Sequence, residues 1–274
     1  PSAGTVPSGP SLAPAPEAPQ LPKAKIYGSP LSCHVLSPAL FAMDTGVGDF
    51  LFGDFQGSEN KTHELVAINP FRQMPLYEGA DGVVCGESST MLRHMASNYA
   101  PAFYPEDAKL RARVDWAMDA ISSSIHSEWC ATVNPVLGFE EPHDHDRGAA
   151  NKRLKDQLDA FVQTFLCGEK YICGHRLTIA DYKALPFLWC SCQPVVETKT
   201  GVQLSTRLKR YVNDVMASVP SATMLKSYHG QSLGELIATR RDVLDYTGPV
   251  VVGGDGVCSL IKSGPAPNSE SLAK

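Results

Sequence analysis

The sequence predicts a two-domain chain, with a small α/β domain at residues 23–97 followed by an all-helical domain at residues 107–247. Two observations support this division. Short apolar runs alternate with loops in the first part, whereas from Asp107 onward the apolar residues recur at helical spacing. The flanking segments 1–22 and 248–274 are rich in small and polar residues, so we expect extended N- and C-terminal tails.

In the first domain the expected elements follow the order β-α-β and then β-β-α. This order is typical of a compact mixed sheet with helices on its faces. The apolar runs predict strands at 25–27, 50–52, 75–77 and 83–85, and helices at 39–43 and 88–96. One short β-prone run, 250–252, lies in the C-terminal tail.

Three stripes of apolar residues predict the helices of the second domain, because each repeats every three or four residues. Gly168 is expected to end the second helix and Pro220 to follow the third, while residues 98–106 link the two domains. The stripes are Leu110, Val114, Met118, Ile121 and Ile125; Leu154, Leu158, Phe161 and Phe165; and Leu208, Tyr211, Val212 and Val215.

Composition argues against several classes of protein. The net charge is −5, with no Lys/Arg-rich stripe, so we expect no nucleic-acid partner. No apolar run approaches the roughly 20 residues of a membrane-spanning helix, so no membrane span is expected. The eight cysteines are scattered without a CxxC pair, which favours a reducing compartment. We therefore expect a cytoplasmic protein, or an organellar one after removal of a targeting segment.

Three stretches carry the residues that suggest chemistry. The segment 25–33 (KIYGSPLSC) reads as a strand that turns into a helix, where a side chain near the helix start favours an anion such as a thiolate. In 69–78 (NPFRQMPLYE), a cis bond before Pro75 would turn the preceding backbone outward toward a ligand. In 86–89 (GESS), Ser88 is a reasonable N-cap whose neighbouring N–H groups suit a carboxylate.

Together, these stretches resemble the glutathione transferases, and most closely the phi and theta classes. Residues 58–73 align with the phi pattern without a gap, and Glu87-Ser88 falls where the family keeps a Glu-Ser pair. Residues 177–186 (LTIADYKALP) match the motif of the family's helical domain, with Thr178 and Asp181 at capping-box spacing. The resemblance covers roughly residues 24–225 and implies a thioredoxin-like N-terminal domain, an all-α C-terminal domain and commonly a dimer.

The resemblance also implies how glutathione, as co-substrate, would be held. Met74, before a cis Pro75, would offer its backbone to the cysteinyl part of the tripeptide. Glu87 and Ser88 would hold the γ-glutamyl end.

Three further roles follow from the same resemblance. Lys61 and Gln73 would bind the glycyl end, by an ion pair and a hydrogen bond. Ser32 matches the serine whose hydroxyl donates to the glutathione thiolate. Such a bond stabilises the charged sulfur and lowers the thiol pKa, which prepares it to attack a small electrophile.

Some features depart from the family pattern. Asn60 stands where phi enzymes often have a histidine, and the helix after Ser32 lacks the usual arginines. Proline inside a helix costs roughly 3 kcal/mol. We therefore expect Ser37 and Pro38 to be N-cap and first residue of a helix that starts late, which would move its end away from Ser32.

Several residues allow two interpretations. Cys33 aligns with the active cysteine of beta-class enzymes if the alignment shifts by one, but it also suits a buried structural position. The segment 140–147 (EEPHDHDR) contains metal-ligand side chains, although a polar interhelix loop has the same composition. Tyr104, Trp116 and Trp129 are expected in the core or at an interface.

Two functions of different classes fit these residues. The first is an enzyme that transfers glutathione to an electrophile or reduces a peroxide. The second is a non-catalytic transferase-like scaffold subunit that acts through its tails, as in the elongation factor 1 gamma subunit, whose loop resembles residues 77–82 (YEGADG). As partners we expect a homodimer or a larger complex.

Overall fold

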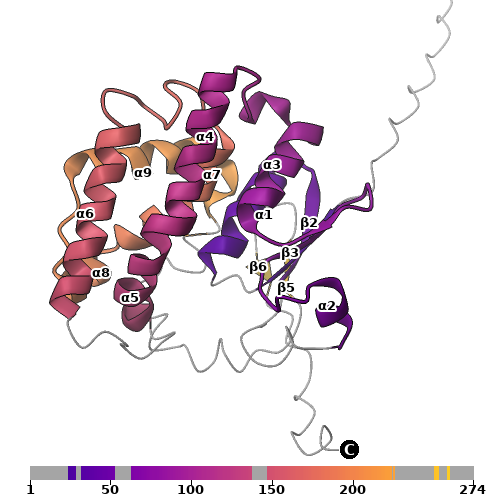
Figure 1. Ribbon diagram of the computed structural model, residues 1–274, viewed down its shortest axis with the longest axis horizontal. Coiled ribbons are helices and arrows are strands. Elements are labelled where there is room, and N and C mark those ends of the chain that lie inside the picture. Colours follow the sequence, from indigo (N-terminus) through magenta and orange to yellow (C-terminus); the bar gives the residue numbers. More distant parts are fainter. Residues whose placement is uncertain are drawn as a thin grey trace, which may run out of the picture.

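A computed structural model gives the arrangement of the chain (Figure 1). It describes residues 24–28, 32–52, 63–137, 147–223, 225, 250–252 and 258–259. Lys61, Asn60, most of the segment 140–147 and the N-terminal tail lie outside these described residues.

The α/β domain is built on a mixed sheet. The central strand β1 pairs in parallel with β2 and antiparallel with β3, so that Ile26 lies between Phe50 and Tyr77. The strand order is β4-β3-β1-β2-β5-β6, which means that two short strands of the C-terminal segment extend the sheet beyond β2. The elements are β1 (Ala24–Gly28), α1 (Cys33–Thr45), β2 (Gly48–Phe52), α2 (His63–Ile68), β3 (Leu76–Glu78), β4 (Val84–Cys85), α3 (Ser88–Tyr99), β5 (Val250–Val252) and β6 (Cys258–Ser259).

The second domain is a bundle of helices that packs against α1 and α3 (Figure 1). Helix α7 runs through its centre with every residue from Ile179 to Ser191 buried. The elements are η2 (Pro101–Phe103), α4 (Ala108–Ala120), the π-helical turn η3 (Ile121–Ile125), α5 (His126–Leu137), α6 (Arg147–Phe165), α7 (Ile179–Ser191), α8 (Pro194–Thr200), α9 (Thr206–Ser218) and η4 (Pro220–Ala222).

The start of α1 corrects one expectation. The helix begins at Cys33 with Ser32 as its N-cap, and Pro38 lies inside it. The Ser37 hydroxyl donates to the Cys33 carbonyl at 2.8 Å and to the Lys183 carbonyl at 3.2 Å, so Ser37 is not a cap. Burial explains the difference, because the residues around Pro38 are fully enclosed and their packing outweighs one lost backbone bond.

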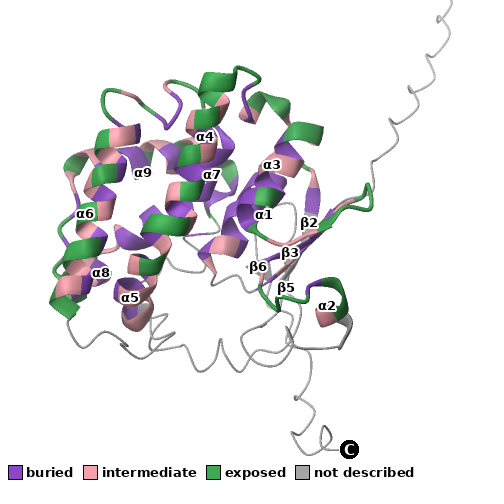
Figure 2. Ribbon diagram, viewed as in Figure 1, coloured by how far each residue is buried: buried purple, intermediate pink, exposed green. Residues whose placement is uncertain are grey.

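The predicted apolar stripes form the core, which is continuous across both domains (Figure 2). One residue of the stripes differs from expectation, since Leu110 is 43% exposed. Of the three aromatic residues, Tyr104 and Trp129 are buried and Trp116 is 60% exposed. Leu110 lies in the first turn of α4, next to residues 106–109, which are exposed as well.

Two further properties concern the described residues as a whole. None of their helices has both the length and the apolar composition needed to cross a bilayer. Seven cysteines from Cys33 to Cys192 are free thiols, and no three His, Cys, Asp and Glu side chains of the described residues gather as a metal site would require.

Candidate functional site

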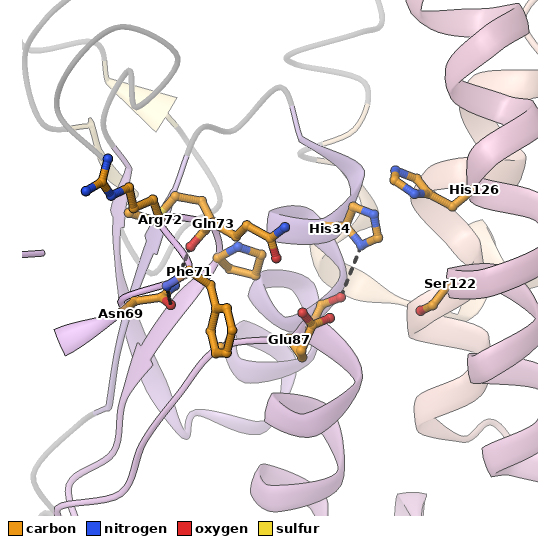
Figure 3. A pocket seen from close by; sticks show the side chains of 12 residues that line it. His34, Asn69, Phe71, Arg72, Gln73, Glu87, Ser122 and His126 are labelled. Carbon is orange, nitrogen blue, oxygen red and sulfur yellow. Dashed lines mark hydrogen bonds between the residues drawn. The ribbon is translucent and has the colours of Figure 1, made fainter. Parts of the chain in front are cut away.

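A cavity of about 590 Å³ opens between the two domains (Figure 3). The α/β domain supplies the loop before β3 and the turn before α3, and the helical domain supplies residues of η3 and α5. The lining residues are His34, Asn69, Phe71, Arg72, Gln73, Met74, Pro75, Gly86, Glu87, Ser88, Ser122 and His126.

One wall of the cavity is the loop that leads into β3. The peptide bond between Met74 and Pro75 is cis, as expected. The buried Asn69 side chain holds the loop, since its amide donates to the Gln73 carbonyl at 2.6 Å and its oxygen accepts from the Phe71 N–H at 3.2 Å. The sequence therefore builds a braced backbone beside the cavity, because an asparagine can both donate and accept within one turn.

The facing wall is the turn that starts α3. Glu87 is the N-cap, with a φ of +62° that L-residues rarely adopt, and its exposed carboxylate lies at the cavity. Ser88 was expected to be the N-cap, but it is the first helical residue and its hydroxyl makes no capping bond. The first backbone N–H groups of α3 lack intrahelical partners, so this turn is suited to hold an anion.

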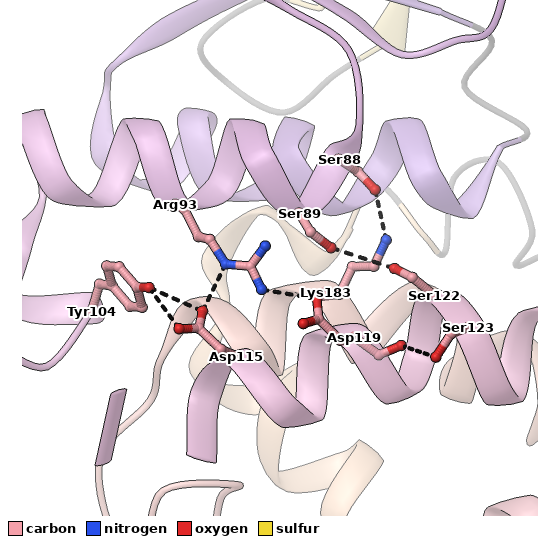
Figure 4. A network of polar contacts seen from close by, with 9 residues as sticks. All are labelled: Ser88, Ser89, Arg93, Tyr104, Asp115, Asp119, Ser122, Ser123 and Lys183. Carbon is pink, nitrogen blue, oxygen red and sulfur yellow. Dashed lines mark hydrogen bonds and ion pairs between the residues drawn. The ribbon is translucent and has the colours of Figure 1, made fainter. Parts of the chain in front are cut away.

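The Ser88 hydroxyl forms a hydrogen bond with the helical domain. Lys183 of α7 donates to it at 2.6 Å (Figure 4). Nδ1 of His34 lies 3.3 Å from the same hydroxyl (Figure 3) and 3.2 Å from the lysine nitrogen. Burial is the main cause that lowers the pKa of Lys183 to about 8. Burial, followed by the charges of Lys183 and His126, lowers the pKa of His34 to about 2, so this imidazole is neutral.

Aromatic rings close the side of the cavity that faces the helical domain. The rings of His34 and His126 meet edge to face at 4.3 Å between centroids, and both also contact Phe187. The Cys130 sulfur lies 3.2 Å from Nε2 of His126. This side therefore offers imidazole edges next to apolar surface, which suits a ligand with a flat or weakly polar group.

The structure brings most of the predicted site residues together. Gln73, Met74, Pro75, Glu87 and Ser88 all line the same cavity. Ser32 is half-buried at the start of α1 and is not among the lining residues. The expected role of Lys61 falls outside the described residues.

Sequence reasoning missed several residues of the site. Asn69 is the first residue of the quoted stretch 69–78, and His34 directly follows the stretch 25–33, so their polar character beside the expected ligand contacts was an available signal. His126, Ser122 and Lys183 gave no such signal, because they come from distant helices.

Parts of this chain are similar in sequence to known proteins. Residues 119–218 match the family model described as glutathione S-transferase, C-terminal domain. Glutathione S-transferase PARB of Nicotiana tabacum is 24% identical over 174 residues, which is 60% of this chain and 80% of that protein. Elongation factor 1-gamma 1 of Oryza sativa subsp. japonica is 30% identical over 146 residues, but these are only 34% of its length.

Solved structures share the fold. A diazinon-metabolizing glutathione S-transferase of the silkworm Bombyx mori superposes with a TM-score of 0.63 at 21% identity, covering 78% of this chain and 99% of that one. Glutathione transferase F2 of Populus trichocarpa gives a TM-score of 0.60, also at 21% identity, over 80% of this chain and 99% of the other. At these identities the likeness establishes the architecture, a thioredoxin-like domain followed by a helical domain.

Proposed function

We propose that the chain is a member of the glutathione transferase family, and that it binds glutathione in the cavity between its domains and transfers it through sulfur. The observation that carries the proposal is the convergence of two walls on one cavity. The cis Met74–Pro75 backbone forms one wall, and the Glu87-Ser88 turn at the start of α3 forms the other. A tripeptide with a free carboxylate and amine at one end matches this pair of walls.

In this proposal each part of glutathione has its own partner. The backbone of Met74 pairs with the cysteinyl residue. Glu87 binds the γ-glutamyl amine, while Ser88 and the N–H groups of α3 bind its carboxylate. Gln73 and Lys61 hold the glycyl carboxylate.

Ser32 is the proposed activating residue. It caps the start of α1, and its hydroxyl makes no capping hydrogen bond, so the hydroxyl is available to a ligand. Donation to the sulfur would lower the thiol pKa and raise the thiolate fraction at neutral pH. The acceptor is a small electrophile or a hydroperoxide.

Calorimetry and kinetics test the proposal directly. The wild type is expected to release heat with millimolar glutathione and to turn over a generic aryl halide or hydroperoxide. Ser32→Ala should lower kcat/KM about 10- to 100-fold, because one hydrogen bond to a charged group is lost. The control is Ser123→Ala, at an exposed hydroxyl that bonds only within its own helix, and it should change nothing. The absence of any heat in the wild type would overturn the proposal.

A second candidate is a non-catalytic scaffold subunit. Two observations favour it: Ser32 does not line the cavity, and the chain shares 30% identity over 146 residues with elongation factor 1-gamma 1. In this case the protein would bind glutathione weakly or not at all, and its tails would make protein contacts within a homodimer or a larger assembly.

Kinetics and tail deletions separate the two candidates. A scaffold should show no turnover and no effect of Ser32→Ala, and should lose its partners when residues 1–22 or 248–274 are removed. Unchanged partner recovery in both deletions, assayed by pull-down and light scattering, would speak against it.

A further inference from the structure

Lys183 is a cation without access to solvent. Its side chain is 0% exposed, and Ser88, to which it donates, is 2% exposed. Its hydrogen-bonding partners among the described residues are neutral: the Ser88 hydroxyl at 2.6 Å and His34 Nδ1 at 3.2 Å. No carboxylate of the described residues lies within ion-pair distance of Lys183. A buried ammonium in this position destabilises the fold unless an anion approaches it.

The hydrogen bonds around Lys183 determine which way the Ser88 hydroxyl points. An ammonium only donates, so Ser88 Oγ must accept from Lys183 and direct its own hydrogen elsewhere. The available acceptors are Nδ1 of His34, at a long 3.3 Å, and a ligand atom in the cavity that Ser88 lines. When a ligand oxygen accepts the hydrogen bond from Ser88, Lys183 can still donate to Nδ1 of His34. The triad of Lys183, Ser88 and His34 is thus arranged to present a polarised donor to the cavity.

We propose that Lys183 is a positioning residue for the α-carboxylate of a γ-glutamyl ligand: it fixes Ser88 as a donor to that carboxylate and supplies the buried positive charge behind it. This inference rests on the proposed glutathione binding and extends it. Lys183 does not line the cavity itself, so it acts through Ser88 and through its electric field.

The charged and titratable groups around Lys183 are consistent with this role. The carboxylate of Glu87, the Cys33 thiol of α1 and Asp119 of α4 favour its charged form, whereas burial and Arg93 of α3 oppose it. His34 adds no competing charge because its pKa is far below neutrality. The Phe187 ring lies 5.6 Å from the ammonium on the side of the helical domain. A bound carboxylate would add the close counter-charge that this set lacks.

Two ligands and two variants test the inference by calorimetry. S-methylglutathione has no titrating thiol, and the S-methyl form of 4-aminobutanoyl-cysteinylglycine differs from it only in lacking the α-carboxylate. Lys183→Met should bind S-methylglutathione about 10- to 100-fold more weakly than the wild type, but should bind the analogue as well as the wild type does. Lys183→Gln keeps a hydrogen-bond donor for Ser88 without the charge. Its affinity for S-methylglutathione should lie between those of the wild type and Lys183→Met. Lys209→Met, which removes a lysine paired with Glu197 away from the cavity, is the control and should bind both ligands normally.

The pH profile provides a readout that a purely structural lysine would not change. The ratio of wild-type to Lys183→Met affinity cancels the titration of the ligand amine. It should be constant near neutrality and decline above about pH 8, where Lys183 loses its proton. Equal affinities of wild type and both folded variants for S-methylglutathione would overturn the role of Lys183 alone. Failure of the wild type to bind S-methylglutathione at all would instead overturn the proposed function.

Discussion

Lys183 also governs how stability should depend on pH. Burial lowers its pKa in the folded chain from 10.5 to about 8, so between these values the unfolded chain binds more protons than the folded chain. The free energy of unfolding therefore rises with pH across this window, by about 3 kcal/mol for this one group. Lys183→Met should lack this rise and should be more stable than the wild type at pH 7, since no buried charge remains.

Urea unfolding of both proteins from pH 7 to 10 measures this difference. Comparison with Lys183→Met is needed because buried tyrosines such as Tyr182 and Tyr211 have raised pKa values and reduce stability at high pH in both proteins. Parallel pH curves for the two proteins would show that Lys183 is not desolvated in the way that the structure indicates.

The residues of the site differ in how well sequence could predict them. Glu87 and Ser88 could be found because they adjoin a helix start and match a local motif. The contact between Lys183 and His34 could not be found, because the two residues are 149 positions apart in the sequence and meet only when α7 packs against α1. Read from sequence, Lys183 is one cation in an apolar helix, and spacing alone does not show that its side chain reaches Ser88.

At the scale of single elements, the start of helix α7 depends on one buried carboxylate, that of Asp181. The buried Asp181 carboxylate accepts hydrogen bonds from Thr178 N–H at 2.8 Å, Ile172 N–H at 3.1 Å and the Tyr211 hydroxyl at 2.8 Å. Asp181→Ala should therefore cost about 3–5 kcal/mol, because it leaves several buried donors without an acceptor. Thr178→Ala should cost only about 1 kcal/mol, as an ordinary cap does. Chemical denaturation measures both, and equal losses would mean that Asp181 is no more than a cap.

Helix α1 shows the limit of local rules at the same scale. The capping box of α7 was predicted correctly from Thr178 and Asp181, since both partners lie within one turn. The late start predicted for α1 from Pro38 was wrong, since the helix begins five residues earlier, at Cys33. When a helix end is exposed, local propensity determines the residue at which the helix begins. Helix α1 is instead enclosed by α3, α7 and the sheet, so tertiary packing determines its limits.

In the whole molecule, the two domains share one core. Helix α1 of the α/β domain packs against α7, and their apolar residues belong to one continuous cluster. Polar contacts join the same pair of domains, since Asp44 of α1 accepts from the Tyr182 hydroxyl at 2.9 Å and from the Ser221 N–H at 2.8 Å. Arg93 of α3 also pairs with Asp115 and Asp119 of α4. Neither domain can lose its packing without exposing the apolar surface of the other.

This shared core predicts that the two domains unfold together, although two-domain chains often unfold in steps. The three tryptophans, Trp116, Trp129 and Trp189, all lie in the helical domain, so their fluorescence reports on that domain alone. Hydrogen exchange of the β1 and β3 amides reports on the other domain. Both probes should give one midpoint in urea, because unfolding of one domain alone would expose the apolar α1–α7 interface of the other domain to water. A lower midpoint for the sheet amides than for the fluorescence would mean that the α/β domain separates first, and that the cavity between the domains opens before the helical domain unfolds.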